Sequence, residues 1–226
     1  MKRFYKAATV GPDRSILLDG RPVKTPGRAA LALPTEALAL AVADEWAAQG
    51  DRIEPRAMPM TGLANAAVDR IAPDPAAFAR GLAVYGESDL LYYRAEGPAA
   101  LAARQSERWD PILAWARQRY DAAFEVTAAL VHVKQPEETI ARLGAAVTAR
   151  DPFRLAGLSP LVTVSGSLLV ALALAEGTLG PDEAWAAAAL DDLWQMERWG
   201  EDAEAAAALA ARRRDFAAGA RFLALL

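Results

Sequence analysis

Two tryptophans and several carboxylates lie within twelve consecutive residues, WQMERWGEDAEA, from Trp194 to Ala205. The four acids in this stretch are Glu197, Glu201, Asp202 and Glu204. Carboxylates can act as general acids and bases, can hold a partner protein, or can cap a helix. A glycosidase-like pair must face across a cleft, whereas acids this close together at the start of a helix point in diverging directions. The pattern therefore favours capping and partner binding over catalysis.

The acids that follow Gly200 occupy the predicted first turn of the last helix. Each acid there gains typically about 0.3–1 kcal/mol from the helix dipole and from unpaired backbone N–H groups. This effect does not explain Trp194 and Trp199 beside them. Aromatic residues with charged neighbours are typical of interface anchors, although tryptophans are also ordinary core residues.

Other residues that could bind a metal or act in catalysis lack the partner residues they would need. The chain has no cysteine and one histidine, His132, so Cys/His zinc sites and multi-histidine metal centres are excluded. His132 lies in the apolar pattern VHV, which favours a hydrogen-bonded structural histidine. Ser165 and Ser167 flank Gly166 without forming a G-x-S-x-G motif. We predict no catalytic residue, no metal and no cofactor.

The composition narrows the range of partners. A net charge of −4 gives no general attraction for phosphates, so we do not expect nucleic-acid binding. The longest apolar run, residues 161–175, is shorter than the roughly 20 residues that span a bilayer. The basic, amphipathic tail from Arg212 onward could lie on an anionic membrane, but a terminal helix docked on the protein is favoured. We expect no stable membrane insertion.

The elements that position these residues fall into a β-rich part and a helical part. Residues 1–34 predict a β-rich domain, with strands near residues 4–10, 15–18, 22–24 and 30–33. Asp19-Gly20 between apolar runs is a strong signal for a two-residue hairpin turn. So small a sheet can hardly bury its own face, and we expect it to pack on the helical part of the chain.

Residues 35–226 predict a mainly helical domain with a short strand pair near residues 124–133. Thr35 is a predicted N-cap, and Gly50 a predicted left-handed C-cap. Pro111 is expected to start a new helix after Asp110. The helices are predicted at about residues 35–49, 61–71, 75–85, 98–120, 137–150, 160–176, 181–199 and 202–222. The predicted fold class is α+β.

Four residues outside the acidic stretch are predicted to support the fold. Trp46 is expected to be buried on the apolar face of its helix, and Trp109 to be structural. Asp89 is expected to pair with Arg94 or to cap a helix.

Several separated motifs, in this order and spacing, resemble one known family. They are Phe4-Tyr-Lys6, Leu18-Asp-Gly-Arg21, Lys24-Thr-Pro26, Glu45-Trp46, Ile53-Glu-Pro55, Met58-Pro-Met-Thr61, Asp89-Leu-Leu-Tyr-Tyr-Arg94, Gln105, Trp109-Asp-Pro111, Val133-Lys-Gln-Pro136, Gln195 and Trp199-Gly-x-Asp202-x-Glu204. Together they resemble the assembly chaperones for the alpha subunit of the F-type ATP synthase catalytic head. Ser88 departs from the family pattern, in which threonine is expected. The resemblance runs from Phe4 to about Arg214.

The resemblance implies a chaperone and not an enzyme. Members of this family bind the unassembled alpha subunit and prevent its aggregation until the beta subunit replaces them. The family fold is likewise a small β-rich domain with a larger helical one. The resemblance places Asp202 and Glu204 in a recurrent acidic motif, with Glu204 expected to hold the client. Glu201, Trp199 and Gln195 are expected to border that surface.

The resemblance also implies a location. The chain begins with strand-like sequence and lacks the presequence of mitochondrial members, so we expect a bacterial, cytoplasmic protein; eukaryotic relatives act in the mitochondrial matrix. We expect a monomer.

Two alternative functions stay open: a carboxylate-dependent hydrolase using Glu197, Glu201 or Glu204, and a peripheral membrane module using the C-terminal helix.

Overall fold

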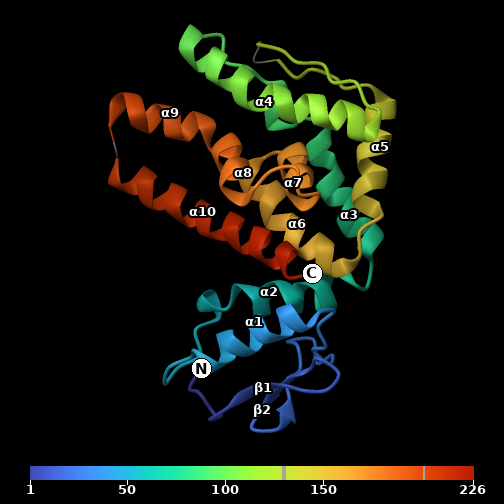
Figure 1. The fold of residues 1–226 in the computed structure, drawn as a ribbon, viewed down its shortest axis with the longest axis vertical. Coiled ribbons are helices and arrows are strands. Elements are labelled where there is room, and N and C mark those ends of the chain that lie inside the picture. The colour runs from blue at the N-terminus through green and yellow to red at the C-terminus, as the bar shows by residue number, and fades with distance from the viewer. Residues whose placement is uncertain (129–130, 201) are drawn as a thin grey trace. The chain divides into compact units, whose positions relative to one another are not determined.

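The computed structural model describes residues 1–128, 131–200 and 202–226. A small antiparallel sheet lies at the N-terminus and helices make up most of the rest (Figure 1), so the α+β class is confirmed. The chain divides into two compact units. The N-terminal unit comprises Met1–Pro75, Asp151–Gly157 and Arg221–Leu226. The helical unit comprises Ala76–Arg150 and Leu158–Ala220.

The sheet contains three strands in the order β1-β2-β3: Ala8–Val10, Ile16–Leu18 and Arg21–Pro22. Leu18 pairs with Arg21 across a two-residue turn, in which Asp19 and Gly20 have φ of 49° and 78°. The predicted hairpin is therefore confirmed. The fourth predicted strand makes only isolated bridges, such as Ser15 with Ala32.

Helix α1, Glu36–Ala47, packs on β1 and β2 and begins at the predicted N-cap, where Thr35 Oγ1 accepts from Leu38 N. The prediction of Gly50 as a left-handed cap is wrong, because α1 ends at Ala48 in a right-handed conformation. Gln49 takes over the capping role. Its amide donates to Glu45 O and accepts from Glu54 N, which satisfies the end of the helix.

Helix α2, Pro59–Ala66, continues into a π-helical turn, Ala67–Ile71, within the same unit. Glu45 fixes the start of α2, since its carboxylate accepts hydrogen bonds from Met60 N, Thr61 N and Thr61 Oγ1 at 2.7–2.8 Å. These contacts explain why the compact unit extends beyond residue 34, the predicted domain boundary: the sheet buries its face against α1, and α1 holds α2.

The helical unit is built around α7, Leu168–Ala175, in which all six residues from Leu168 to Ala173 are buried. Helices α6 and α10 contribute residues to both units. The remaining helices are α3 (Pro75–Ala83), α4 (Ala99–Tyr120), α5 (Glu137–Thr148), α6 (Pro152–Ser165), α8 (Pro181–Ala188), α9 (Leu190–Trp199) and α10 (Ala203–Ala224), with short 3-10 helices at Pro55–Ala57, Val84–Gly86 and Leu90–Tyr92. Every described helix is too short or too polar to cross a bilayer.

Two predicted helix boundaries are wrong. Pro111 lies inside one continuous helix, α4, instead of starting a new one, because buried neighbours such as Trp109, Ile112 and Leu113 hold both sides of the proline in the same helix. Helix α6 begins at Pro152 and not near Pro160, which lies inside it. The apolar run then breaks at Gly166, whose φ is +69°.

The predicted strand pair near residues 124–133 is also wrong in the described part, where no strand is found at residues 124–128 or 131–133. A side chain takes the place of a strand partner here. The Gln135 amide donates to Glu125 O and accepts from Glu125 N. Thr127 forms an isolated bridge with Tyr93. Leu130, part of the predicted pair, lies outside the described residues.

Candidate functional site

A hollow of about 190 Å³ lies between the end of α9 and the start of α10, in the acidic stretch singled out from the sequence. It contains three of the five predicted partner-binding residues, Gln195, Trp199 and Asp202. The complete lining is Asp192, Gln195, Met196, Trp199, Gly200, Asp202, Ala205 and Leu209.

Helical periodicity brings these residues to one surface. Asp192, Gln195, Met196 and Trp199 follow the spacing of one helix face on α9. Ala205 and Leu209 on α10 are four residues apart and likewise share a face. The sequence-based prediction missed Asp192, Met196 and Leu209, although the helical spacing from Trp199 would have pointed to the first two.

The two tryptophans of the stretch have opposite environments. Trp194 is 8% exposed, and the guanidinium groups of Arg104 and Arg198 lie 5.6 and 5.0 Å from the centre of its ring. Trp199 is 77% exposed. Trp194 therefore belongs to the fold, whereas Trp199 exposes a large apolar surface.

The turn between the helices depends on Gly200 and Asp202. Gly200 has φ of +85°, a conformation that side-chain-bearing residues rarely adopt. Asp202 is the N-cap of α10: its Oδ1 accepts from Glu204 N at 2.8 Å, and its carbonyl accepts from Ala206 N. The capping interpretation is confirmed for Asp202. Glu201 lies outside the described residues, and its predicted role stays a prediction.

Glu204 lies in the first turn of α10, with an exposed side chain, and does not line the hollow. Its carboxylate makes no hydrogen bond or ion pair with any described residue. An acid at this position gains from the helix dipole and keeps its hydrogen-bonding capacity for another molecule.

Helix α9 is fixed on α4 by polar contacts along its length. The Arg104 guanidinium makes two hydrogen bonds to Glu197, at 2.6 and 3.1 Å. The buried Gln105 amide donates to Asp191 and accepts from Ala95 N. Trp109, 1% exposed, donates its indole N–H to the carbonyl of Ala187 in α8, the preceding helix. The bonds to Glu197 and Asp191 hold α9, the helix that carries Gln195 and Trp199.

Helix α10 is fixed by both charge and apolar burial. Arg212 bonds Asp192 at 2.8 Å and the carbonyl of Val164 at 3.3 Å. Phe216 is 1% exposed, and its ring centre lies 5.5 Å from that of Trp185. The expected docking of this helix on the protein is therefore observed in the helical unit.

The predicted supporting residues lie away from the hollow. Asp89 is fully buried and caps two segments: one oxygen accepts from Leu91 N and the other from Leu169 N, at the start of α7. Arg94 pairs with Asp110 and not with Asp89. Its guanidinium also lies 4.9 Å from the ring centre of Trp109.

The prediction that Trp46 is buried on the apolar face of its helix is wrong, because its side chain is only half-buried. Its ring contacts Tyr5 in the N-terminal unit, with ring centres 5.6 Å apart, and it lines a separate hollow there.

The acids near the hollow are not arranged as a catalytic pair. The hydrogen bond from Arg104 holds the pKa of Glu197 below its usual range, whereas a general acid needs a raised pKa. Among the described residues no group of three His, Asp or Glu side chains is placed to hold a metal ion. His132 is exposed, and its Nδ1 lies 3.2 Å from the hydroxyl of Tyr93.

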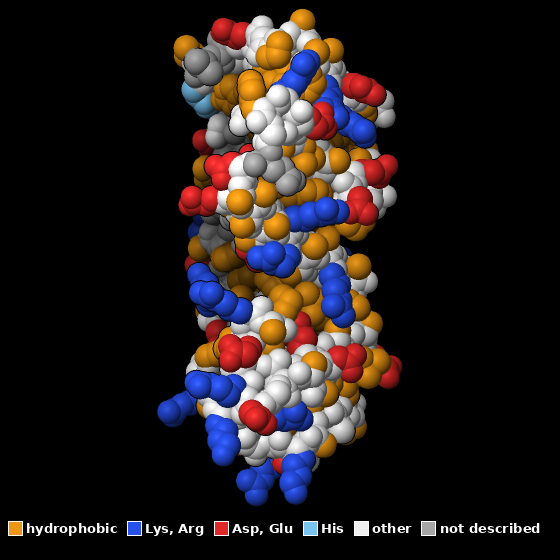
Figure 2. All heavy atoms as spheres, turned by 90° about the vertical axis from the view of Figure 1, so that its left-hand side faces the viewer, with side chains coloured by type: hydrophobic (Ala, Val, Ile, Leu, Met, Phe, Trp, Pro, Cys, Tyr) orange, Lys and Arg blue, Asp and Glu red, His pale blue; other side chains and the backbone are white. Residues whose placement is uncertain are grey.

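Figure 2 views the protein from the side on which α9 and α10 meet in Figure 1. Hydrophobic side chains are exposed there between acidic and basic ones. A mixture of apolar centre and charged surroundings is typical of the rim and core of a protein-binding surface.

Several solved structures are similar to this chain. The crystal structure of Atp12 from Paracoccus denitrificans is similar over 99% of this chain and 97% of that chain, with 41% sequence identity and a TM-score of 0.93. A mutant of the same Paracoccus protein gives a TM-score of 0.94 at 41% identity, with the same coverage. The Atu1473 protein of Agrobacterium tumefaciens matches 98% of this chain and 85% of its own, with 42% identity and a TM-score of 0.92.

The family described as ATP12 chaperone protein matches residues 2–117. That match ends before the hollow, but the similarity to the Paracoccus structure covers nearly the whole chain. The chain therefore belongs to the ATP12 chaperone protein family.

Proposed function

We propose that this protein is an assembly chaperone that binds the unassembled alpha subunit of F-type ATP synthase. It prevents aggregation of that subunit and releases it when the beta subunit takes its place. It acts as a monomer in the cytoplasm of a bacterium. The observation that carries this proposal is the match to Atp12 over 99% of the chain at 41% identity.

The surface around the hollow provides the chemistry that such a role requires. An alpha subunit without its neighbours exposes apolar surface, and patches above a few hundred Å² are prone to aggregate. Trp199 is the apolar anchor for this surface, since burial of an exposed tryptophan on binding is worth about 3 kcal/mol. The hollow beside it accepts a small side chain of the client.

The polar groups around Trp199 supply orientation. The Gln195 amide can donate to and accept from a client backbone, and the Glu204 carboxylate can pair with a client Lys or Arg. Charged groups on a rim change the rate and specificity of binding more than its final strength. A contact of this kind remains displaceable, as a chaperone that hands over its client requires.

The two alternatives have less support. A hydrolase would need converging acids with raised pKa values, but Glu197 is held by Arg104 with a lowered pKa, and Glu204 is exposed outside the hollow. A membrane-binding helix would need a free apolar face, but Phe216 and Phe222 of α10 are both buried.

The test is a light-scattering assay with purified, unassembled alpha subunit from the same organism. We expect an equimolar amount of wild-type protein to suppress aggregation, and Glu204→Lys to suppress it several-fold less. Glu36→Lys is the matched control, because Glu36 is also an exposed acid in the first turn of a helix. Loss of the helix dipole contribution is then equal in both variants.

The outcomes separate the function from the site. Failure of the wild type, with alpha shown to aggregate alone, contradicts the proposed function. Equal suppression by wild type, Glu204→Lys and Glu36→Lys leaves the function standing and removes Glu204 from the site.

A further inference from the structure

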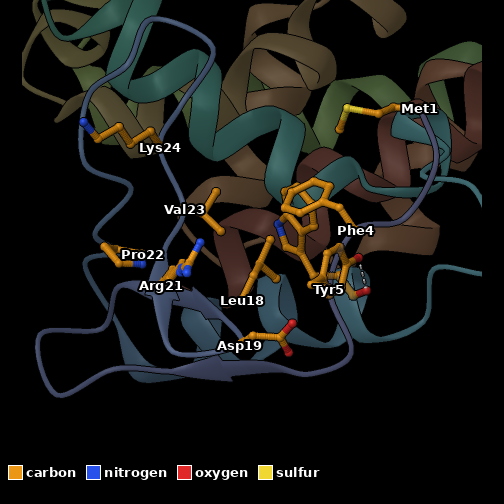
Figure 3. Close-up of a pocket in the computed structure, with 10 residues that line it drawn as sticks. Met1, Phe4, Tyr5, Leu18, Asp19, Arg21, Pro22, Val23 and Lys24 are labelled. Carbon is orange, nitrogen blue, oxygen red and sulfur yellow. Dashed lines mark hydrogen bonds between the residues drawn. The ribbon is translucent and has the colours of Figure 1, made fainter.

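A second hollow, of about 680 Å³, lies wholly within the N-terminal unit. Figure 3 shows Val23 on one side of it, Phe4 and Tyr5 on the other, and Leu18 between the two sides. Its size falls within the range of roughly 300–1,000 Å³ that is typical of ligand pockets. Nothing in the chaperone surface described above makes use of it.

The floor of this hollow is preformed. Tyr5 and Leu18 belong to the buried core of the N-terminal unit and are 5% and 6% exposed. The Tyr5 hydroxyl donates to the backbone carbonyl of Trp46 at 2.6 Å, which fixes the Tyr5 ring against α1. An occupant would therefore meet an ordered apolar surface and would cause little loss of conformational entropy in the protein.

The rim of the hollow exposes apolar side chains. Phe4 is 66% exposed and Met1 69%. In addition, Trp46 Nε1 is buried and has no hydrogen-bond acceptor among the described residues. A buried donor without an acceptor costs about 1–3 kcal/mol.

The charge at the rim is positive. Arg21 and Lys24 are exposed, and neither side chain makes an ion pair or hydrogen bond with a described residue. The one acid in the lining, Asp19, is already engaged, since it accepts hydrogen bonds from Ala7 N and Lys6 N, which lower its pKa.

The surrounding sequence strengthens this positive charge. The first 35 residues contain only two acids, Asp13 and Asp19, in a chain whose net charge is −4. The basic residues in the same segment are Lys2, Arg3, Lys6, Arg14, Arg21, Lys24 and Arg28. Figure 2 shows Lys and Arg side chains projecting from the N-terminal unit. An acidic partner is complementary to this surface.

The residue types favour a polypeptide as the partner. Tryptophan, tyrosine and arginine are the residues enriched at the energetic centres of protein interfaces, and Trp46, Tyr5 and Arg21 occur together here. A small anion would use the two cations but would leave the exposed Phe4 and Met1 uncovered.

We propose that this hollow is a second client contact, which takes one apolar side chain from an acidic segment of the alpha subunit. Carboxylates of that segment pair with Arg21 and Lys24. Only the identity of the protein that carries the segment rests on the proposed function.

The experiment places a photo-crosslinking benzoylphenylalanine at Phe4, where the exposed side chain tolerates replacement. The full-length protein is mixed with unassembled alpha subunit and irradiated. The same group at Val84, which is 55% exposed in the helical unit, is the control for random contact. We expect crosslinking at position 4 to exceed that at position 84 by at least fivefold.

A charge test accompanies the crosslink. Arg21→Glu with Lys24→Glu should weaken crosslinking at position 4 about fivefold in low salt, and less at high salt, because exposed ion pairs are screened. Arg56→Glu with Arg70→Glu makes the same charge change on exposed residues of the same unit, outside the hollow, and should have little effect. Circular dichroism melting checks that each variant is folded.

Each outcome is decisive. Equal crosslinking at positions 4 and 84, with wild-type protein that suppresses alpha aggregation, overturns this inference and leaves the chaperone function intact. Equal weakening by both double variants also overturns it, since the effect would then follow total charge. Crosslinking that depends on Arg21 and Lys24, without suppression of aggregation, would support the hollow and contradict the chaperone function.

Discussion

At the scale of single residues, burial separates side chains that support the fold from those that are exposed to other molecules. Trp194 and Trp199 are five residues apart, yet the first is enclosed by Arg104 and Arg198 and the second is 77% exposed. The sequence could place both in one motif because their spacing is visible there. It could not tell them apart, since their exposure depends on where α4 packs.

Replacement of Trp199 should separate binding from stability. We expect Trp199→Ala to weaken alpha-subunit binding by about tenfold or more, because the anchor is removed. Its free energy of unfolding should change by less than about 0.5 kcal/mol. Trp109→Ala, at a position 1% exposed, should instead lose about 3–5 kcal/mol of stability. Titration of labelled alpha and urea unfolding measure the two effects. A destabilised Trp199→Ala would contradict the assignment of Trp199 to a surface.

Asp89 should make stability depend on pH. Burial raises the pKa of this carboxyl to about 6 from 3.8, against the opposing effect of hydrogen bonds from Leu91 N and Leu169 N. The folded protein therefore binds the proton more tightly than the unfolded chain does. Below a pH of about 4, the protonated Asp89 carboxyl contributes roughly 3 kcal/mol to the free energy of unfolding. This contribution is lost as the pH rises through about 6.

The measurement is urea unfolding of wild type and Asp89→Asn between pH 4 and 7.5. The asparagine has no charge to titrate, so the difference between the two proteins isolates Asp89 from other acids. We expect the stability of wild type relative to the variant to fall as the pH rises. A difference that stays constant would show that the carboxyl does not titrate in this range.

At the scale of elements, local signals in the sequence predicted one turn and one helix start correctly, but failed at Gly50 and Pro111. Asp19-Gly20 predicted a hairpin, and Thr35 a helix start, because the turn and the cap are formed by neighbouring residues. The strand pair near residues 124–133 failed because the Gln135 side chain satisfies Glu125 in place of a second strand. Hydrophobic periodicity carries no signal for a side chain that takes the place of a neighbouring strand.

The start of α2 depends on a distant carboxylate. Glu45 on α1 accepts three hydrogen bonds from Met60 and Thr61, and its negative charge lies at the helix N-terminus. Glu45→Gln should cost about 1–3 kcal/mol of stability, since the amide keeps one acceptor oxygen and turns its NH2 group toward the backbone N–H that the other oxygen accepted. Glu54→Gln, at an exposed acid without a capping bond, should be nearly neutral in the same thermal melt. Equal losses would contradict an anchoring role for Glu45.

Pro111 offers a stabilising change within α4. An interior proline removes one helical hydrogen bond and crowds the preceding turn. Pro111 is exposed, so Pro111→Ala should restore the bond without loss of buried contacts. Alanine also increases the entropy of the unfolded chain, which offsets part of the gain. We expect a net increase of about 1–2 kcal/mol, seen as a higher melting temperature. A lower one would show that the proline helps to shape α4.

At the scale of the whole molecule, the two compact units carry different surfaces. The helical unit offers Trp199 with nearby acids, and the N-terminal unit offers an apolar hollow with Arg21 and Lys24. The acidic stretch indicated the first surface because its residues lie close together in the chain. Motifs near the N-terminus, such as Phe4-Tyr-Lys6 and Leu18-Asp-Gly-Arg21, contribute to the second surface, but no sequence pattern showed that α1 brings Trp46 beside them.

Sedimentation velocity can show whether the protein holds the unassembled alpha subunit and gives it up to the beta subunit. Fluorescently labelled alpha subunit is sedimented with this protein before and after addition of the beta subunit. We predict a one-to-one complex that dissociates as an alpha–beta complex forms, and no complex with the beta subunit alone. Labelled alpha that sediments without this protein bound, while remaining soluble and folded, would contradict the account.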